Sequence, residues 1–534
     1  MAENQGGEYF SEHLRLSPLP HHRLLAHFNF TTRVPLTQDD GSYGHHYHIF
    51  PRAIGDIVQE YQADELHFTL GRGQWDHQRW GYPPVESVGS GADLWAYLTP
   101  QKPTSPLNED EGEDPISSYR EMQDRWGRLT GAMAGLFCAS LNFMDSTTTA
   151  SPALSFPPLG HVSPRARLMR SSLAHESLCT ENLTPFIKQL PCRDQAGIAR
   201  LLSPHTILSS TFHVISIHVR RLCSHSEEDG NDEDEEMEEK CFSPYWEVTQ
   251  LVTTVLKSGD DTGEQGSFDL STSFGEVLPL DSCPVALDST IQAIDAQGND
   301  HMLSLVDTDS SEAQEGWNKV ITLLSKGTNL SYSSSSFSSI RVNRRLAGTG
   351  QDGGKFVITI TNTHPSESIP ATYLDVIPWY LRPYLSTLTA TINGTLAPEV
   401  IQAQRYQTAR DRERPSIIEL ILQLPPSSIL TLVLDVDRAM LKYSEHPPDA
   451  NRGFDLPPAI LTLHHRPGQV SSEDADGGPW RLYTSPLLVS LPTPDFSMPY
   501  NVITLTCTTV ALFFGSMFNL LTRQLVPVKV PMSS

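Results

Sequence analysis

The stretch NVITLTCTTVALFFGSMFNLLT, residues 501–522, has no charged side chain and lies close to the C-terminus of a 534-residue chain. A helix that rises about 1.5 Å per residue needs about 20 apolar residues to cross the hydrocarbon core of a bilayer, so this stretch can span it. Arg523 and Lys529 follow it, and no basic residue lies between 491 and 500. Because basic residues mark the cytoplasmic end of a span, we predict a transmembrane helix over 500–522, a cytoplasmic tail over 523–534 and a lumenal or extracellular body.

Two other interpretations of this stretch fit less well. A buried core helix seldom stays uncharged over such a length. A cleavable signal for a lipid anchor would end in its hydrophobic tail, whereas here basic residues follow the apolar run.

Small residues recur along one face of the predicted span, at Thr504, Thr508, Ala511 and Gly515. Helices associate in lipid through close packing of small residues and through hydrogen bonds. The stripe therefore indicates either a helix that packs against partner spans or a chance pattern in a threonine-rich segment.

Composition is consistent with a lumenal protein and argues against a nucleic-acid-binding protein. The chain is 38% hydrophobic, which is enough for at least two cores, and its net charge of -25 is the wrong sign for phosphate backbones. Ten of the negative charges lie in one run over 227–239, so we predict a disordered acidic loop over 224–240. The opening residues MAENQGGEYFSEHL carry no secretion signal, so we expect either a mature start or a truncated sequence.

Acceptor sequences for N-glycosylation agree with a lumenal body. In LLAHFNFTTRV, alternation places Phe28 and Phe30 on one strand face and Asn29 on the other, where a glycan would meet water. The four predicted acceptors are Asn29, Asn182, Asn329 and Asn393.

Six cysteines lie outside the predicted span and none has CxxC spacing, while Cys507 lies within the span. In an oxidising compartment the six allow fifteen full pairings. Two intrachain pairs are candidates: Cys223 with Cys241, which flank the acidic loop, and Cys192 with Cys283.

That scheme leaves two cysteines without a partner. Cys138 lies in the apolar run AGLFCASL, which is typical of a buried free cysteine. Cys179 lies in the polar segment ESLCTENLTP and is the better candidate for an intermolecular bridge.

The pattern of apolar residues predicts a mainly β fold. Strands are expected over 24–34, 65–70, 93–98 and 207–219, and a helix begins at the capping box Ser118 to Glu121. Beyond residue 355, short β runs punctuated by proline indicate a β-sandwich. We therefore predict an α+β N-terminal module over 1–256 and a β-sandwich-like module over 257–499, with Ser- and Gly-rich loops over 325–354.

No catalytic signature is present: the chain has neither HExxH nor GxSxG. His45, His46 and His48 have no cysteine or carboxylate at metal-ligand spacing, so we expect no metal, no cofactor and no catalytic residue. The aromatic segment from Trp75 to Tyr82 could be a sugar- or peptide-binding platform, but core or interdomain packing fits it better.

Four longer segments resemble one known family. They are CASLNFMDST (138–147), CTENLTPF (179–186), NTHPSESIPATYLDVIPWYLRPY (362–384) and LYTSPLLVSLPTPDFSMPYNVITLTCT (482–508). With them the chain is similar over most of its length to the PIG-T family of glycosylphosphatidylinositol (GPI) transamidase subunits.

The resemblance implies a type I glycoprotein of the endoplasmic reticulum membrane that is a non-catalytic scaffold. The implied partners are the caspase-like catalytic subunit PIG-K, together with PIG-S, PIG-U and a Gaa-type subunit, around the GPI glycolipid and the proprotein substrate. It also implies that Cys179, the cysteine of CTENLTP, forms the disulfide to PIG-K. The alternative function is a single-pass cargo receptor or lectin-like glycoprotein that uses the segment from Trp75 to Tyr82.

Overall fold

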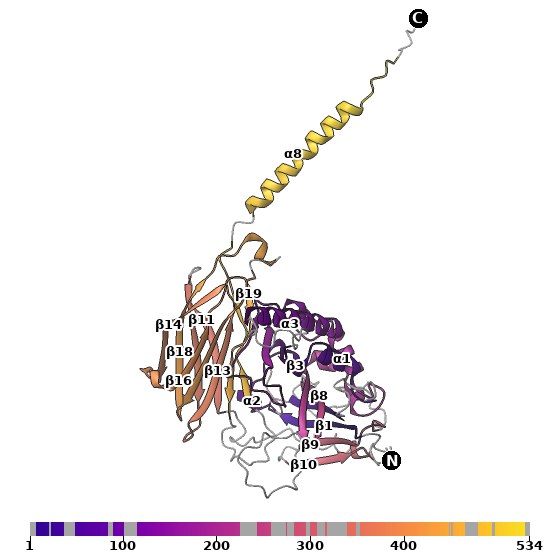
Figure 1. Cartoon of the computed structure of the whole chain (residues 1–534), viewed down its shortest axis with the longest axis vertical. Helices are drawn as coiled ribbons and strands as arrows, with labels where there is room; N and C mark the ends of the chain where they lie inside the picture. The colour runs from indigo at the N-terminus through magenta and orange to yellow at the C-terminus, as the bar shows by residue number, and fades with distance from the viewer. Residues whose placement is uncertain are drawn as a thin grey trace, which may run out of the picture.

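The computed structural model shows two modules side by side and one separate helix, α8 (Ser497–Thr522), that leaves the body as a rod (Figure 1). The structure describes residues 7–20, 23–36, 48–83, 89–100, 115–224, 243–257, 274, 282–294, 299–306, 315–317, 339–348, 353–447, 449, 452–464, 479–493 and 497–528.

A ten-stranded sheet forms the first module. Its order is β10-β9-β1-β2-β8-β7-β3-β4-β6-β5, and all neighbours are antiparallel except β1 and β9. In β2, Phe28 and Phe30 are buried in the main core while Asn29 between them is partly exposed, as the alternation predicts. The strands are β1 (Tyr9–Leu19), β2 (Arg23–Pro35), β3 (Ala63–Arg72), β4 (Gly91–Leu98), β5 (Thr149–Ala150), β6 (Arg167–Leu173), β7 (Phe212–Ser224), β8 (Ser243–Lys257), β9 (Asp288–Ile294) and β10 (Asp300–Ser304).

Helices cover the face of this sheet that is turned toward α8 (Figure 1). The longest of them, α3, buries Met122, Trp126 and Leu129 at helical spacing in the core that it shares with the sheet. The described helical elements of the module are α1 (Arg52–Glu60), α2 (His77–Trp80), α3 (Pro115–Phe137), η1 (Leu141–Phe143), α4 (Thr180–Lys188), η2 (Ile198–Leu201) and α5 (Pro204–Ser209).

The second module is a sandwich of two five-stranded sheets, which confirms the predicted fold class. One sheet has the order β11-β12-β18-β14-β15 and the other β16-β17-β13-β20-β21, and apolar residues from both enclose one core. The elements are β11 (Ile340–Ala347), β12 (Gly353–Asn362), β13 (Ile369–Ile377), β14 (Leu381–Ile392), β15 (Thr395–Leu396), η4 (Pro398–Val400), β16 (Ile401–Gln407), β17 (Ser416–Leu424), β18 (Ser428–Arg438), η5 (Tyr443–Glu445), β19 (Phe454–Leu456), β20 (Ile460–Leu463), β21 (Trp480–Tyr483) and β22 (Leu487–Val489).

The boundary between the modules differs from the one predicted at residue 256. Strand β9 pairs with β1 and continues the first sheet, and Trp317 is fully buried in the first core. The second module begins at β11, so the boundary lies between Trp317 and Ile340. The prediction was wrong because the loop after β8 looks like a linker in sequence, whereas the parallel pairing of β9 is a long-range contact.

Two shorter predictions also change. Residues 204–209 form α5, so the strand expected from residue 207 begins at Phe212 instead. Strand β11 and the first residues of β12 occupy part of the loop predicted over 325–354. The acidic loop predicted over 224–240 lies outside the described residues after Ser224.

The two modules share a buried interface. Trp95, Phe156 and Leu168 of the first module pack with Leu374 and Tyr483 of the second in one apolar cluster. Arg481, which is 1% exposed, places its guanidinium carbon 4.4 Å from the ring centroid of Phe156 and 5.5 Å from that of Trp95. A guanidinium over two aromatic faces is favourable because the ring faces carry negative partial charge.

A buried carboxylate also joins the modules. Glu419 on β17 is completely buried and accepts hydrogen bonds from the backbone N–H groups of Ala153, Leu154 and Ser155, at 2.9, 2.9 and 3.1 Å. The hydroxyl of Ser155 donates a fourth bond at 2.9 Å. Three consecutive amides of the first module therefore depend on one side chain of the second, and we call this arrangement the Glu419 clasp.

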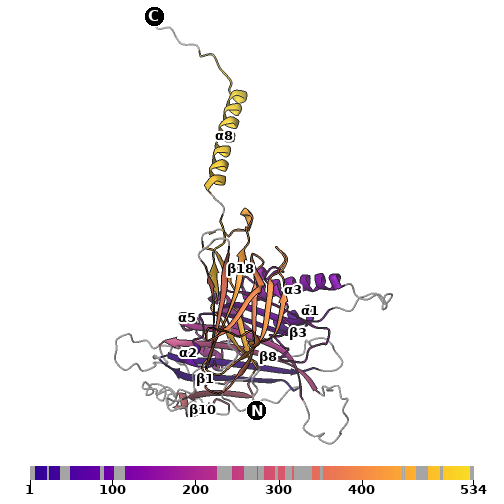
Figure 2. The same cartoon turned by 90° about the vertical axis from the view of Figure 1, so that its left-hand side faces the viewer.

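Helix α8 is the one candidate membrane span among the described residues, and none of its residues over Tyr500–Thr522 is buried. Figure 2, turned by 90°, shows that it leaves the body at the same end as in Figure 1. The hydroxyl of Thr508 donates to the carbonyl oxygen of Thr504 at 2.7 Å, so this hydroxyl has its partner within the helix. Thr504, Thr508, Ala511 and Gly515 lie on one face, and a partner span for that face stays a prediction.

Burial makes one histidine a source of pH-dependent stability. His27 on β2 contacts the hydroxyl of Thr253 at 2.9 Å, and burial, with a smaller effect from the charge of Arg15, lowers the pKa of His27 to about 3. Below about pH 6.5 the unfolded chain binds a proton at this residue and the folded chain does not. The stability is therefore complete above about pH 6.5 and decreases as the pH falls toward 3.

We expect a shift from pH 6.5 to pH 5 to cost about 2 kcal/mol of stability through His27 alone. Urea unfolding of the purified chain, followed by tryptophan fluorescence at both pH values, measures this cost. The variant His27→Gln does not titrate and should lose about 2 kcal/mol less than the wild type over the same shift. Equal losses in the two proteins would contradict the assignment.

Candidate functional site

The predicted intermolecular cysteine stands at the N-terminus of a short helix on the surface. Cys179 immediately precedes α4, and its backbone is extended, with φ -132° and ψ 177°. The thiol is free and the residue is exposed. Its backbone N–H donates to Oδ1 of Asn182 at 2.8 Å, which fixes the start of the helix. An exposed thiol on an ordered backbone is suited to a bond with another chain.

Asn182 is a positioning residue and not a glycan acceptor in the folded chain. It is completely buried, and its Nδ2 donates to the carbonyl oxygens of Phe137 at 2.9 Å and Cys138 at 3.0 Å. A glycan on this nitrogen would have to occupy the core and would remove these bonds. This burial argues against the glycosylation predicted for Asn182, whose bonds join the end of α3 to the start of α4.

A second exposed thiol lies beside the first. Cys138 follows α3 directly, in a left-handed conformation with φ 52°, and it is free and exposed. The prediction that Cys138 is buried is thus wrong, because the helix ends one residue earlier and turns it outward. Both cysteines bond to the same side chain, that of Asn182, through their backbones.

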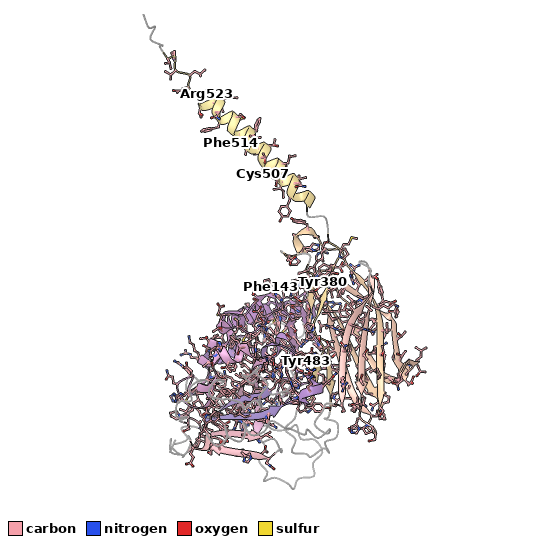
Figure 3. All side chains as sticks on the ribbon, turned by 180° about the vertical axis from the view of Figure 1, so that it is seen from behind. Phe143, Tyr380, Tyr483, Cys507, Phe514 and Arg523 are labelled. Atoms are coloured by element: carbon pink, nitrogen blue, oxygen red, sulfur yellow. A yellow bond between two sulfur atoms is a disulfide. The ribbon has the colours of Figure 1, made fainter. Side chains whose placement is uncertain are left out.

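An apolar side chain completes this surface. The 138–144 segment is held to the segment before α4 by a bond from the N–H of Ser140 to Oε1 of Glu176, at 2.9 Å. Phe143 is 66% exposed, and Figure 3 shows it at the end of the body that faces α8. We call Cys138, Phe143 and Cys179 the thiol surface. Exposed aromatic rings are enriched in protein interfaces, so the thiol surface is a candidate docking site.

Three other described cysteines form disulfides. Cys192 and Cys283 form a disulfide with Cα atoms 5.9 Å apart, which is the second of the two candidate pairs. Cys223 is also disulfide-bonded, and Cys241 lies outside the described residues. In the described residues the free thiols are those of Cys138, Cys179 and Cys507, the last one on α8.

A buried acid holds the segments around that disulfide together. Glu12 on β1 accepts from the hydroxyl of Ser289 at 2.7 Å and from the N–H groups of Ile198 and Cys283 at 3.2 and 3.4 Å. Burial raises the pKa of Glu12 even though these three bonds oppose the shift. The carboxyl therefore joins segments that are distant in sequence.

The two other glycosylation acceptors that the structure describes, Asn29 and Asn393, differ in their surroundings. Asn29 is partly exposed in the middle of the ten-stranded sheet, and its Oδ1 accepts from the hydroxyl of Thr31. Asn393 is exposed in the tight turn between β14 and β15, with φ 49°. Asn329 lies outside the described residues.

We expect Asn393 to carry a glycan and Asn182 to carry none. The variant Asn393→Gln should then migrate faster on a gel by one glycan, and glycosidase treatment should remove the difference from the wild type. Asn182→Gln serves as the matched variant and should not change the glycan count, although losing its buried bonds should lower stability by about 2 kcal/mol. Loss of a glycan in Asn182→Gln would contradict the buried placement.

The aromatic segment near Trp75 packs inside the protein. Trp75 is 3% exposed, with its ring centroid 5.5 Å from that of Phe212, and Tyr82 contacts Trp480 of the second module at 5.8 Å between centroids. Gln74 accepts a bond from the hydroxyl of Ser485 at 2.7 Å. Trp75 therefore packs within the first module and Tyr82 packs between the modules, while Gln74, Trp75 and Ile340 line a cavity of about 290 Å³.

Within the described residues no group of three or more His, Cys, Asp or Glu side chains is placed to hold a metal ion. Of the three histidines near residue 46, the described one is His48, whose backbone N–H donates to Glu8 at 3.0 Å.

Comparison with known proteins identifies the relatives of this chain. A family model described as "Gpi16 subunit, GPI transamidase component" matches residues 1–265 and 260–532. The chain is 33% identical to the mouse and human proteins named "GPI-anchor transamidase component PIGT", covering 96% of this chain and 89% and 90% of theirs. It is 30% identical to the Saccharomyces cerevisiae "GPI transamidase component GPI16", covering 97% of this chain and 89% of that one. A solved β-N-acetylglucosaminidase from Vibrio harveyi matches with a TM-score of 0.16, too low for any argument.

Proposed function

This chain belongs to the Gpi16 family of GPI transamidase components, and from this premise we propose that it is the non-catalytic scaffold subunit of that complex. In this role it holds the caspase-like catalytic subunit PIG-K through a disulfide from Cys179. It also holds PIG-S, PIG-U and a Gaa-type subunit, so that GPI is attached to proprotein C-termini. The body lies in the lumen of the endoplasmic reticulum and α8 crosses its membrane.

The observation that carries the proposal is the exposed, free Cys179 on an ordered helix start. The compartment is oxidising, so thiol–disulfide exchange with the disulfide of an oxidoreductase can join Cys179 to a partner thiol, and the oxidoreductase takes up the two electrons and two protons as its two thiols. Phe143 on the same surface supplies apolar contact area around it. A covalent link makes the attachment independent of concentration.

A scaffold must also hold its partners at a fixed position relative to the membrane. The buried interface between the two modules supports this role. The apolar cluster around Trp95, the guanidinium of Arg481 and the Glu419 clasp join the sandwich to the first module. The sandwich leads directly to α8. A catalytic subunit attached at Cys179 is therefore held at a restricted distance from the bilayer where the lipid substrate lies, which raises the effective concentration of one for the other.

Purification of the full chain in a mild detergent tests this function. A scaffold brings along several multispanning membrane proteins together with a cysteine protease homologue. A receptor or lectin-like glycoprotein, which is the alternative, comes away alone or with soluble cargo, and that result would contradict the proposal.

A further inference from the structure

One end of the sandwich gathers exposed apolar side chains. Met440 is 77% exposed, Leu488 is 57% exposed and Tyr443 is 50% exposed. They come from two segments that meet: Nη1 of Arg438 donates to the carbonyl oxygen of Ser490 at 3.1 Å, and Met440 and Leu488 each lie two residues from this bond. We call Met440, Tyr443 and Leu488 the apolar rim.

The apolar rim lies at the end of the body from which the membrane helix leaves. The N–H of Ala439 donates to the carbonyl oxygen of Tyr380 at 2.8 Å, which ties the loop after β18 to that residue. Figure 3 shows Tyr380 at the end of the body that faces α8, and Figures 1 and 2 agree on the side from which α8 departs.

The connection to the membrane helix is short. Leu491 is 6% exposed and is part of the sandwich core, so the chain belongs to the body up to that residue, and α8 begins at Ser497. Six extended residues span at most about 21 Å. The 26 residues of α8 are about 39 Å long, which exceeds the hydrocarbon thickness of about 30 Å. The start of α8 therefore lies among the lipid headgroups, and the apolar rim lies within reach of the same layer.

Two arginines near the apolar rim are paired, and Lys442 beside them is exposed. Arg412 contacts Glu445, and Arg382 contacts Asp411 at 2.8 Å. The guanidinium of Arg412 also lies 4.7 Å from the ring centroid of Trp379. One lysine beside two paired arginines gives anionic lipid little positive charge to bind, so an apolar contact with the membrane interface fits this end better than electrostatic attraction.

We propose that the apolar rim rests in the interfacial layer of the lumenal leaflet, as a second contact with the bilayer beside α8. Met and Leu side chains exposed to this extent gain by leaving water, and Tyr is favoured at the membrane interface. The occupant is the lipid surface itself, zwitterionic lipid included. The inference depends on α8 as a membrane span and is independent of the role proposed for Cys179. The contact fixes the tilt of the body relative to the membrane.

Photocrosslinking tests this contact. A benzophenone amino acid is placed at Met440 in one full-length protein and at Leu488 in another, each reconstituted in phosphatidylcholine vesicles and, separately, kept in native membranes with its complex. The matched control is Leu396, which is 76% exposed, nearly the same as Met440. Leu396 lies in the β14–β15 hairpin, which contacts Ile429 at the end of β18 that is opposite to the apolar rim. Replacement of exposed side chains leaves the core intact.

After irradiation, mass spectrometry should find lipid adducts at Met440 and Leu488 about ten times as often as at Leu396. Adducts as rare as at Leu396 would overturn the inference. So would adducts with another membrane protein in place of lipid, which would assign the apolar rim to a subunit interface. If either probe prevents folding, Tyr443 takes its place. Because vesicles with the chain alone suffice, the result does not depend on the transamidase role.

Discussion

Cys179→Ser is expected to abolish the disulfide-linked species that joins this chain to the catalytic subunit. The wild-type protein should run on a non-reducing gel as an adduct that a thiol reagent dissolves, because the thiol of Cys179 is free, exposed and fixed by the helix start. Serine keeps the size and the backbone geometry but cannot form the bond. Transamidase activity in cells should fall about tenfold or more as the effective concentration of the catalytic subunit drops. Non-covalent contacts should preserve part of the complex.

Cys138→Ser is the matched control for this experiment. Cys138 is a free, exposed cysteine that contacts the same Asn182 side chain, so the variant tests whether any thiol on the surface suffices. We expect its adduct to equal that of the wild type. An undiminished adduct in Cys179→Ser, or loss of the adduct in Cys138→Ser alone, would contradict the assignment.

Glu419→Ala is expected to destabilise the interface between the two modules at the Glu419 clasp. The substitution leaves the buried N–H group of Ser155 without its acceptor, at a cost of about 1–3 kcal/mol, and it also removes the part-buried bonds from the N–H groups of Ala153 and Leu154. Partial relaxation and water entry offset some of this, so we expect a net local loss of about 4 kcal/mol. That loss corresponds to an increase of about a thousandfold in the hydrogen-exchange rate of these amides.

Hydrogen exchange of the peptide that contains Ala153 to Ser155 measures this effect, in the full chain. Glu413→Ala is the control, because Glu413 lies in the turn between β16 and β17, is 67% exposed and pairs with Arg410 at the surface. Its exchange should match the wild type. Unchanged protection in Glu419→Ala would mean that the apolar cluster alone holds the segment.

Local patterns allowed much of the fold to be predicted from sequence. Three of these patterns involve only neighbours within a few residues along the chain. They are the uncharged run that forms α8, the alternation of Phe28 and Phe30 in β2, and the strands of the sandwich with prolines between them. Prediction failed where a distant contact decides the structure. The parallel pairing of β9 with β1 moved the module boundary, and no local signal reports such a pairing.

At the candidate site, too, local sequence patterns predicted some features and missed those that depend on distant contacts. The polar surroundings of Cys179 correctly indicated exposure. The acceptor sequence at Asn182 was misleading, because the same residue occupies the third position of α4 and caps it; the spacing from Cys179 to Asn182 could have indicated this role. Glu419 interrupts the apolar run SIIELILQL, which signals a buried acid, but its partners are more than 260 residues away and cannot be found from sequence alone.

We propose that this chain holds the catalytic subunit of GPI transamidase through Cys179. To test this bond, the free thiols of the intact, non-reduced complex are first blocked, and its peptides are then analysed by mass spectrometry. We expect a peptide with Cys179 joined through a disulfide to a peptide of the cysteine-protease subunit, and Cys138 recovered with the blocking group. Recovery of Cys179 with the blocking group, or joined to Cys138, would contradict it.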